Sequence, residues 1–505
     1  MAIPIAAFGQ RRPTFSDLML MRRLAIYLVT ICTSLAAKPV CAQQASNQPG
    51  DVIYSTTESG IATATDSTSL FTIREIHIEG AKQTRPKMIY RELGFTKGQQ
   101  YPLNTLVDHF RQAKTNLMNT GMFLDVVVAL KSLQGYDATV LISVKERWYI
   151  FPMPFARVVD RGLQDWIQNQ NMDPNRIKYG IKITHRNFTG RNDRATLDFT
   201  HGYTQQVGLR YSGLQLDRRL HWTANVSVDF GKNRDVMYAT EEGRRLNFND
   251  PARFVHSYLR TGVEAVYRPG FLTRHTFGLG YNNENISDSV FIMNPSFAFQ
   301  KGRVQFVDLY YRMQYFGVDF IPYPTKGVAV DFLINKRGLT PDFKLWQATL
   351  RTWVTWPLGR KWYLNNNNVA HVKLPFRQPF ITQGFLGVGN TYMQGYEDYF
   401  IDGVAGGYTK WSISRNIINT TFHINSNRIK KLSIIPFKVY AKTFVNAGYV
   451  YNRENFKPNL FNNRPLYSGG VGLDIILFYD MMLKVEWSWN HLGQNGLYLH
   501  NKNYL

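Results

Sequence analysis

From residue 176 to the end of the chain, apolar and polar residues alternate with a period of two, the pattern of β-strands with one apolar face. Between positions 307 and 315 the odd residues are Val, Leu, Tyr, Met and Tyr, whereas the even residues are Asp, Tyr, Arg and Gln. After residue 42 we find no apolar run long enough for a membrane-spanning helix, which needs about 20 residues. Such a chain can enter a bilayer only as a closed barrel, because every strand must pair its backbone groups.

Sixteen segments have this pattern, an even number, as single-chain bacterial barrels require. Tight turns alternate with longer links such as 231–256 and 374–406, and short turns on one side with long loops on the other are typical of outer-membrane barrels. Aromatic residues at strand ends indicate a girdle at the membrane surface (Tyr267, Phe271, Trp353, Trp356, Trp362, Trp487 and Trp489). The predicted strands are 178–187, 194–203, 207–216, 220–230, 257–268, 273–283, 289–299, 303–316, 326–336, 345–356, 361–373, 407–419, 434–450, 466–479, 481–491 and 495–501.

The N-terminus resembles a removable secretion leader. A basic start at Met21-Arg22-Arg23 precedes the mainly apolar stretch 24–37. Val40-Cys41-Ala42 then places small residues at positions −3 and −1 of a cleavage site before Gln43. We expect a signal peptide at 1–42, with Met19 or Met21 as alternative translation starts. A transmembrane helix is the competing interpretation of the apolar stretch, but the stretch is shorter than such a helix requires.

Cysteine usage and charge agree with export. The two cysteines, Cys32 and Cys41, both lie in the leader, so the mature chain would have no disulfide and no thiolate ligand. A net charge of +23 suits an anionic lipid surface in an exported protein. A soluble β-sandwich or double barrel would also alternate, but the leader, the missing cysteines and the aromatic girdle favour a membrane barrel.

The chain therefore divides into five parts. Residues 43–70, rich in Ser, Thr, Ala and Gln, are interpreted as a flexible linker. Residues 71–148 have a β-α-α-β-β pattern with an amphipathic helix, and form one small α+β domain. Residues 149–175 are predicted to be a connector, and 176–505 a mainly β, 16-stranded antiparallel transmembrane barrel.

The small domain resembles a POTRA domain, and the whole chain resembles the BamA/TamA-type family of outer-membrane assembly proteins. The resemblance rests on Ile76-His77-Ile78-Glu79-Gly80, Thr84, the runs 89–93, 116–117, 120–123 and 126–128, and Gly98. The family usually has Asn after the strand-ending Gly, and Ala81 stands there instead. The resemblance covers residues 71–505, nearly all of the mature chain.

Two further segments of the barrel match the family. Met393-Gln394-Gly395-Tyr396-Glu397 stands where the family has a hydrophobic-Arg-Gly-aromatic motif, on the long loop after the eleventh strand, which the resemblance implies folds into the lumen. Phe444-Val445-Asn446-Ala447-Gly448 stands where the family often has Phe-x-Asp-x-Gly.

The two departures from the family pattern go together, since Gln394 replaces Arg and Asn446 replaces Asp. Losing one partner of an ion pair would bury an unpaired charge, whereas two amides can hydrogen-bond each other. We hypothesise that the side chains of Gln394 and Asn446 form a neutral latch. The alternative is that the packing of Tyr396 holds the loop and the amides are incidental.

The resemblance implies insertion of other outer-membrane proteins. Unfolded clients would pair with the POTRA edge by β-augmentation and pass to a weak seam between the first and last strands. Candidate residues are Val126, Val127, Val128, Ala129 and Leu130 on the edge, and Gly180 and Gly496 at the seam. The alternative function is a dedicated secretion pore of the two-partner type, which usually carries two POTRA domains. A passive porin is a third class, and it needs no POTRA domain.

We expect a bacterial outer-membrane protein with its POTRA domain in the periplasm. Its partners would be unfolded outer-membrane clients, lipid or lipopolysaccharide and accessory assembly proteins, but not nucleic acid. Basic pairs at 218–219, 244–245 and 430–431 are candidates for lipid phosphates, with a solvated loop as the alternative. No nucleophile elbow, phosphate loop or His pair at ligand spacing occurs, so we predict no catalysis, cofactor or metal.

Overall fold

The computed structural model describes residues 69–158, 171–298, 301–339, 344–388, 391–423, 434–453 and 455–500. They belong to one compact unit, Val52–Leu505. The predicted signal peptide and nearly all of the predicted linker lie outside the described residues. No helix in the described ranges is both long and apolar enough to cross a membrane.

Residues 70–146 form an α+β domain in which two helices cover a four-stranded sheet of order β2-β1-β4-β3. Strand β1 is parallel to β4, and the other two pairs are antiparallel. The sequence pattern predicts three strands, and β2, which has only three residues, is a fourth that the pattern does not reveal. The elements are β1 (Leu70–Glu79), α2 (Pro86–Tyr90), β2 (Gln100–Pro102), α3 (Leu103–Asn119), β3 (Phe123–Gln134) and β4 (Asp137–Glu146).

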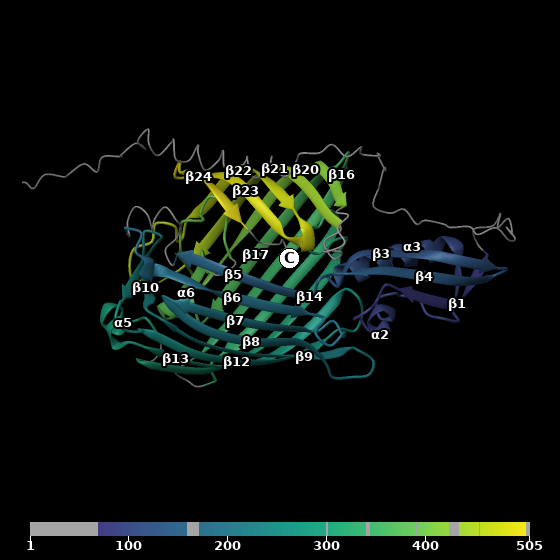
Figure 1. Cartoon of the computed structure of the whole chain (residues 1–505). Coiled ribbons are helices and arrows are strands. Elements are labelled where there is room, and N and C mark those ends of the chain that lie inside the picture. The colour runs from purple at the N-terminus through teal and green to yellow at the C-terminus, as the bar shows by residue number, and fades with distance from the viewer. Residues whose placement is uncertain are drawn as a thin grey trace, which may run out of the picture. The chain divides into compact units, whose positions relative to one another are not determined.

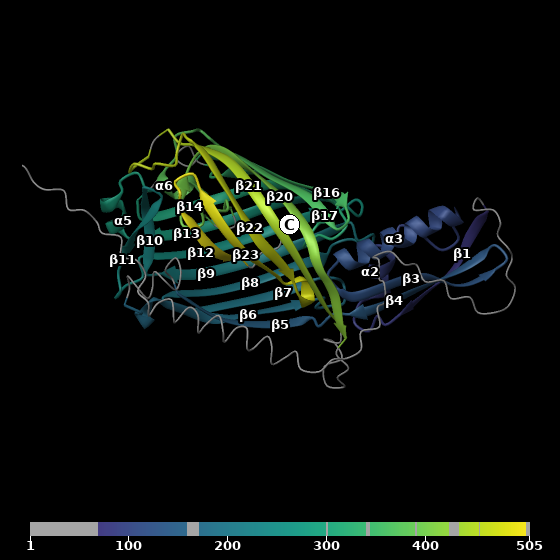
Figure 2. The same ribbon diagram turned by 90° about the horizontal axis from the view of Figure 1, so that it is seen from above.

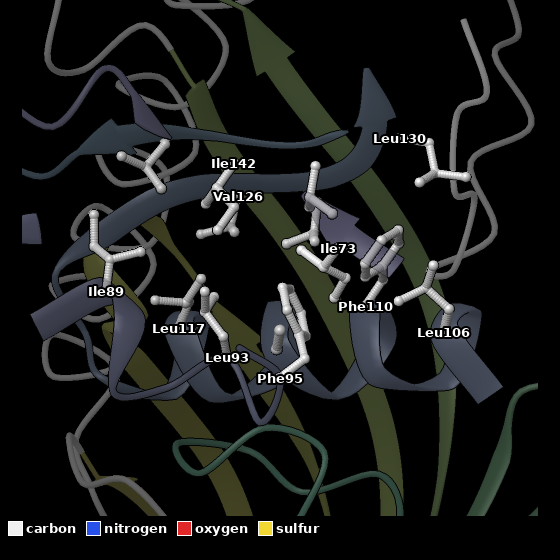
Figure 3. Close-up of a cluster of buried hydrophobic side chains, with 14 of the residues drawn as sticks. Ile73, Ile89, Leu93, Phe95, Leu106, Phe110, Leu117, Val126, Leu130 and Ile142 are labelled. Carbon is white, nitrogen blue, oxygen red and sulfur yellow. The ribbon is translucent and has the colours of Figure 1, made fainter. Parts of the chain in front are cut away.

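The core of this domain follows from the periodicity of its elements. Leu106, Phe110 and Leu117 recur on one face of α3 and are almost fully buried. They pack against alternating strand residues such as Val126 and Ile142, as Figure 3 shows. Since 18 buried residues form this one cluster, the domain has a hydrophobic core of its own.

Most of the remaining described chain forms one 16-stranded sheet, curled into a barrel (Figures 1 and 2), in which each strand pairs antiparallel with the next. Strands β10 (Asp235–Glu241) and β11 (Arg244–Asn249) form a separate antiparallel hairpin within the link 231–256, where no strand was predicted. The fold is thus mainly β, as predicted. The strands are β5 (Ile150–Val158), β6 (Ile177–Arg186), β7 (Arg194–Gly202), β8 (Thr204–Gln215), β9 (Trp222–Asn233), β12 (His256–Tyr267), β13 (Thr273–Ile286), β14 (Arg303–Val318), β15 (Gly327–Arg337), β16 (Leu345–Gly359), β17 (Trp362–Leu374), β20 (Ala405–His423), β21 (Ile434–Tyr451), β22 (Pro465–Ile476), β23 (Met482–Asn490) and β24 (Asn495–His500).

Two predicted segments have a different structure, and these two errors cancel in the count of barrel strands. The predicted connector 149–175 contains β5, which is the first strand of the sheet. The predicted seventh strand, 289–299, is instead the short helix α5 (Asp288–Met293) followed by a turn, and its buried Val290 and Phe291 pack in a small cluster. Strand β17 is therefore still the eleventh.

Strand β5 is a terminal strand because it pairs only with β6 among the described residues. The Arg186 amide donates to the Tyr149 carbonyl (2.7 Å). This bond shows which residues of β5 direct their backbone groups toward β6, because the direction alternates along an antiparallel strand. Residues 151, 153, 155 and 157 then bond β6, so Pro152 and Pro154 stand where an amide would point away from β6. Within a strand, proline is tolerated where its nitrogen would not donate to a ladder, as at this edge, and the two prolines leave the edge two donors short.

Gly80, which ends β1, should be far less replaceable than Gly135, which turns β3 into β4. Both have positive φ (83° and 60°), so alanine costs about 1–2 kcal/mol of strain at either position. A Cβ on Gly80 would also lie 2.0 Å from the Val144 carbonyl oxygen, whereas nothing lies within 4 Å of one on Gly135. We expect Gly80→Ala to accelerate hydrogen exchange across residues 70–146 much more than Gly135→Ala. Equal exchange in both variants would contradict this.

Candidate functional site

The loop between β17 and β20, residues 375–404, is called the lumen loop here. It contains α6 (Phe380–Gln383) and the short strands β18 (Gly384–Leu386) and β19 (Ile401–Asp402). Its motif 393–397 contacts β21, β22 and β23. On β21 the alternation shows which face this is, because Phe444 and Asn446 are buried while Val445 between them is 62% exposed. The motif therefore lies against the inner face of the barrel.

Met393 and Tyr396 fasten the loop by burial. Met393 is fully buried, and the missing side chain of Gly448 makes room for it, since a Cβ there would lie 3.2 Å from the Met393 sulfur. The ring of Tyr396 packs edge-on against Phe461 in the same cluster. The Tyr467 amide donates to the Tyr396 hydroxyl (3.1 Å). Burial raises the pKa of Tyr396 to about 12, which keeps the hydroxyl protonated and able to donate.

The predicted direct hydrogen bond between Gln394 and Asn446 is not formed. Asn446 donates to the Ser468 hydroxyl (3.0 Å), which in turn donates to the backbone carbonyl of Gln394. The Gln394 side chain instead donates to Glu486 Oε1 (3.2 Å). The two amides are thus linked through Ser468, and the latch hypothesis is corrected in this respect.

Glu486 belongs to a buried chain of charges. Lys442 Nζ lies 2.6 Å from Glu486 Oε1 and 2.6 Å from Asp474 Oδ1, and all three side chains are at most 2% exposed. The single lysine compensates half of the charge of the two carboxylates, and Lys484 also attracts Glu486 electrostatically. A neutral glutamine can therefore dock on Glu486, whereas an arginine at position 394 would meet Lys442. No sequence motif predicted this group of buried charges, although the alternation of β23 places Glu486 on the polar face of the strand.

The lumen loop also contacts the last strand. The alternation of β24 directs Leu497 and Leu499 outward, where they are 69% and 68% exposed, and Tyr498 and His500 inward. The Tyr498 hydroxyl donates to Asp398 (3.0 Å), and the ring of His500 stacks on Tyr392 (4.6 Å between centroids). Strand β24 is therefore held by the loop as well as by β23.

The remaining predicted site residues are placed as follows. Val126, Val127, Val128, Ala129 and Leu130 lie on β3, which pairs only with β4 among the described residues and so forms an edge of its sheet. Gly496 lies on the terminal strand β24. Gly180 lies on β6, with β5 on one side and β7 on the other, so its predicted place at the seam is wrong.

Two bidentate ion pairs join the small domain to the barrel. The Arg268 guanidinium donates to both oxygens of Glu92 (2.7 and 2.8 Å), and Glu92 is 1% exposed. Arg147, which is almost fully buried, donates to both oxygens of Asp480. Paired guanidinium and carboxylate forks of this kind fix orientation as well as distance.

The basic pairs are only partly described. Arg245 lies over the ring of Phe400 in the lumen loop, 3.8 Å from its centroid, which gives it a structural contact. Residues 430–431 lie outside the described residues.

Comparisons with known proteins define the class. The POTRA family model, described as "Surface antigen variable number repeat", matches residues 71–147. The fold is similar to CdiB from Escherichia coli (10% identity, TM-score 0.51, covering 86% of this chain and 74% of that one). BamA from Haemophilus ducreyi lacking POTRA domains 1–3 matches with 14% identity and a TM-score of 0.47, over 85% of this chain and 83% of that one. The search of curated proteins found no match.

The protein is thus an outer-membrane-type β-barrel preceded by a POTRA domain. The fold is similar to that of CdiB, and the family model agrees with the POTRA resemblance found in residues 71–148 of the sequence.

Gly395 should be the least replaceable residue of the motif. Its φ is 85°, and a Cβ would lie 2.8 Å from the Ser468 Cβ and 3.1 Å from the Trp489 carbonyl oxygen. Gly395→Ala should cost about 2 kcal/mol and displace the loop tip, which would speed chymotrypsin cleavage at the loop tyrosines at least about fivefold. Gly493→Ala, also at positive φ but with nothing within 4 Å, is the control and should cleave as the parent does.

Proposed function

We propose that this protein inserts other outer-membrane proteins into the outer membrane of a bacterium, with its POTRA domain in the periplasm. An unfolded client would pair with the free edge of β3 and then with the edge of the barrel at β5 and β24. The observation that carries this proposal is the pair of terminal strands, since each has one ladder partner among the described residues.

The POTRA edge supports the first step. Strand β3 has twelve residues and an edge without a partner in the described sheet. An extended client can add to such an edge by main-chain hydrogen bonds, which do not depend on client sequence. The residues that would carry this contact are Val126, Val127, Val128, Ala129 and Leu130.

The seam supports the second step. A client strand entering lipid must first satisfy its backbone, and an existing strand edge provides the partners. Strand β24 has only six described residues, and β5 has two prolines at its outward edge. A seam with few hydrogen bonds opens at a small free-energy cost.

A dedicated protein-secretion pore is the second candidate. Its cargo would pass through the lumen, whereas here the lumen loop is anchored on the inner wall by Met393 and Tyr396. Secretion would require this loop to leave, while insertion at the seam would not. The fold, which CdiB shares, is compatible with both functions.

Depletion of the protein in its native cell, followed by quantitative proteomics of the outer membrane, tests the proposal. We expect many β-barrel proteins to fall together, because the backbone pairing at β3 and the seam does not depend on client sequence. Loss of one secreted protein, with the other barrels unchanged, would support the secretion pore instead.

The prolines of β5 give a sharper test of the seam. Pro152→Val with Pro154→Val adds two amide donors to the edge, so the seam should close more firmly. We expect a higher temperature of barrel unfolding on gels and slower insertion of a client barrel into proteoliposomes. Pro436→Val on β21, a strand that does not border the seam, is the control, and Pro436 pairs with β20 but lies beyond the ladder with β22. A double variant that inserts clients at the parent rate, despite higher stability, would remove the seam from the mechanism.

A further inference from the structure

Three side chains from three different segments meet on the inner face of the barrel near its last strand. They are Glu397 of the lumen loop, Glu486 of β23 and His500 of β24. His500 Nε2 lies 3.4 Å from Glu397 Oε1 and 3.3 Å from Glu486 Oε2. The ligand atoms of the three residues all lie within 4.8 Å of one another.

These three atoms are buried and make no hydrogen bond within the described part of the chain. They are Glu397 Oε1, Glu486 Oε2 and His500 Nε2. The side chain of Glu486 is fully buried, and those of Glu397 and His500 are 8% and 15% exposed. Burial of polar atoms without a partner costs about 1–3 kcal/mol each, so three that converge on one point indicate a missing ligand.

The other atoms of the same side chains are held by protein groups. Glu397 Oε2 accepts a hydrogen bond from the Gly395 amide (2.7 Å), and Glu486 Oε1 lies 2.6 Å from Lys442 Nζ. The ring of Tyr392 stacks on His500 at an interplanar angle of 26°. Each residue thus has one side fixed and one donor atom directed to the common centre, as supporting groups orient the ligands of metal sites.

The two distances from His500 Nε2 to the carboxylates fit a tetrahedral metal ion. Bonds of about 2.0–2.2 Å to imidazole nitrogen and carboxylate oxygen, at tetrahedral angles, separate neighbouring ligand atoms by about 3.3–3.5 Å. The two distances from His500 Nε2 fall in this range. A protonated histidine would instead turn an N–H toward one carboxylate, and no such hydrogen bond is formed.

The surrounding charges restrict which ion would bind. Lys410, Lys442 and Lys484 on this wall oppose any cation, and the carboxylates of Glu397, Glu486 and Asp474 balance them in number. Affinity must then come from direct coordination rather than from long-range attraction. Imidazole with carboxylates suits zinc and similar transition ions, whereas calcium and magnesium prefer oxygen ligands alone.

We propose that Glu397, Glu486 and His500 bind one divalent transition-metal ion of the zinc class, with water or a further ligand completing the tetrahedron. The ion joins the lumen loop, β23 and β24 at one point. It therefore fixes the last strand to the inner wall and stabilises the barrel at one of the two strands that have a single ladder partner in the described sheet.

The test is Co²⁺ and Zn²⁺ binding to the purified full-length protein in detergent, prepared without a histidine tag. We expect one Co²⁺ per chain, the intense visible absorption of a tetrahedral site, displacement by Zn²⁺, and a higher unfolding temperature with either ion. Glu397→Gln and His500→Ala should each weaken binding at least tenfold, because each removes one of three ligands.

His256→Ala is the matched control, because His256 also lies beside a buried carboxylate, Glu284 (3.2 Å), whose other oxygen Arg260 occupies. This variant should bind Co²⁺ as the parent does. The heat-dependent shift in electrophoretic mobility on gels verifies that each variant is folded. Glu397→Gln changes only the charge of a loop residue, so it preserves the fold even if His500→Ala does not. Absence of tetrahedral Co²⁺, or equal affinity in folded Glu397→Gln and parent protein, would overturn the proposal.

Discussion

The pairing of backbone hydrogen bonds governs the whole barrel. A strand in lipid has no water to satisfy its amides and carbonyls, so every strand must lie between two others. Fourteen of the sixteen strands meet this condition in the described structure, and β5 and β24 are the exceptions. The chain places its unusual sequence at these two strands, with prolines in one and only six described residues in the other. The energetic weakness of the sheet is therefore concentrated in its two terminal strands.

On the inner wall that the lumen loop contacts, the buried lysine and the two carboxylates that it pairs with all lie on strands. The family pattern suggested an arginine in the loop and an aspartate on the strand, and this chain has Gln394 and Asn446. The cation is on the strand instead, as Lys442, and the carboxylates are Asp474 and Glu486. Because Lys442 and Lys484 on the strands already act on these carboxylates, the loop docks with a neutral side chain and avoids the desolvation of a further ion.

Periodicity predicted most of the fold because it is a local property of each segment. It failed where a local pattern has two structural meanings. Pro152 and Pro154 indicated a connector, although proline is also compatible with those positions of an edge strand whose backbone amides point away from the sheet. The short apolar run after Asp288 alternates weakly and is compatible with either a strand or a helix, and it became α5. The three-residue strand β2 is too short to leave any pattern.

Contacts within the lumen could not be predicted in the same way. The spacing of histidines along the sequence indicated no metal site, because Glu397, Glu486 and His500 come together only through the path of the lumen loop and the register of β23 with β24. The link from Asn446 to the loop passes through Ser468, a residue that no motif singled out. Such contacts depend on register and loop geometry, which alternation alone does not determine.

The last strand shows how these features depend on one another. Strand β24 has β23 on one side, no ladder partner on the other within the described residues, and the lumen loop against its inner face. If β24 moves away from the barrel, its contacts with Tyr392, Glu397 and Asp398 must break; if the loop leaves, β24 keeps only its ladder with β23. The position of the loop and the freedom of the last strand are therefore two aspects of a single equilibrium. A ligand that binds both would shift it without touching the seam itself.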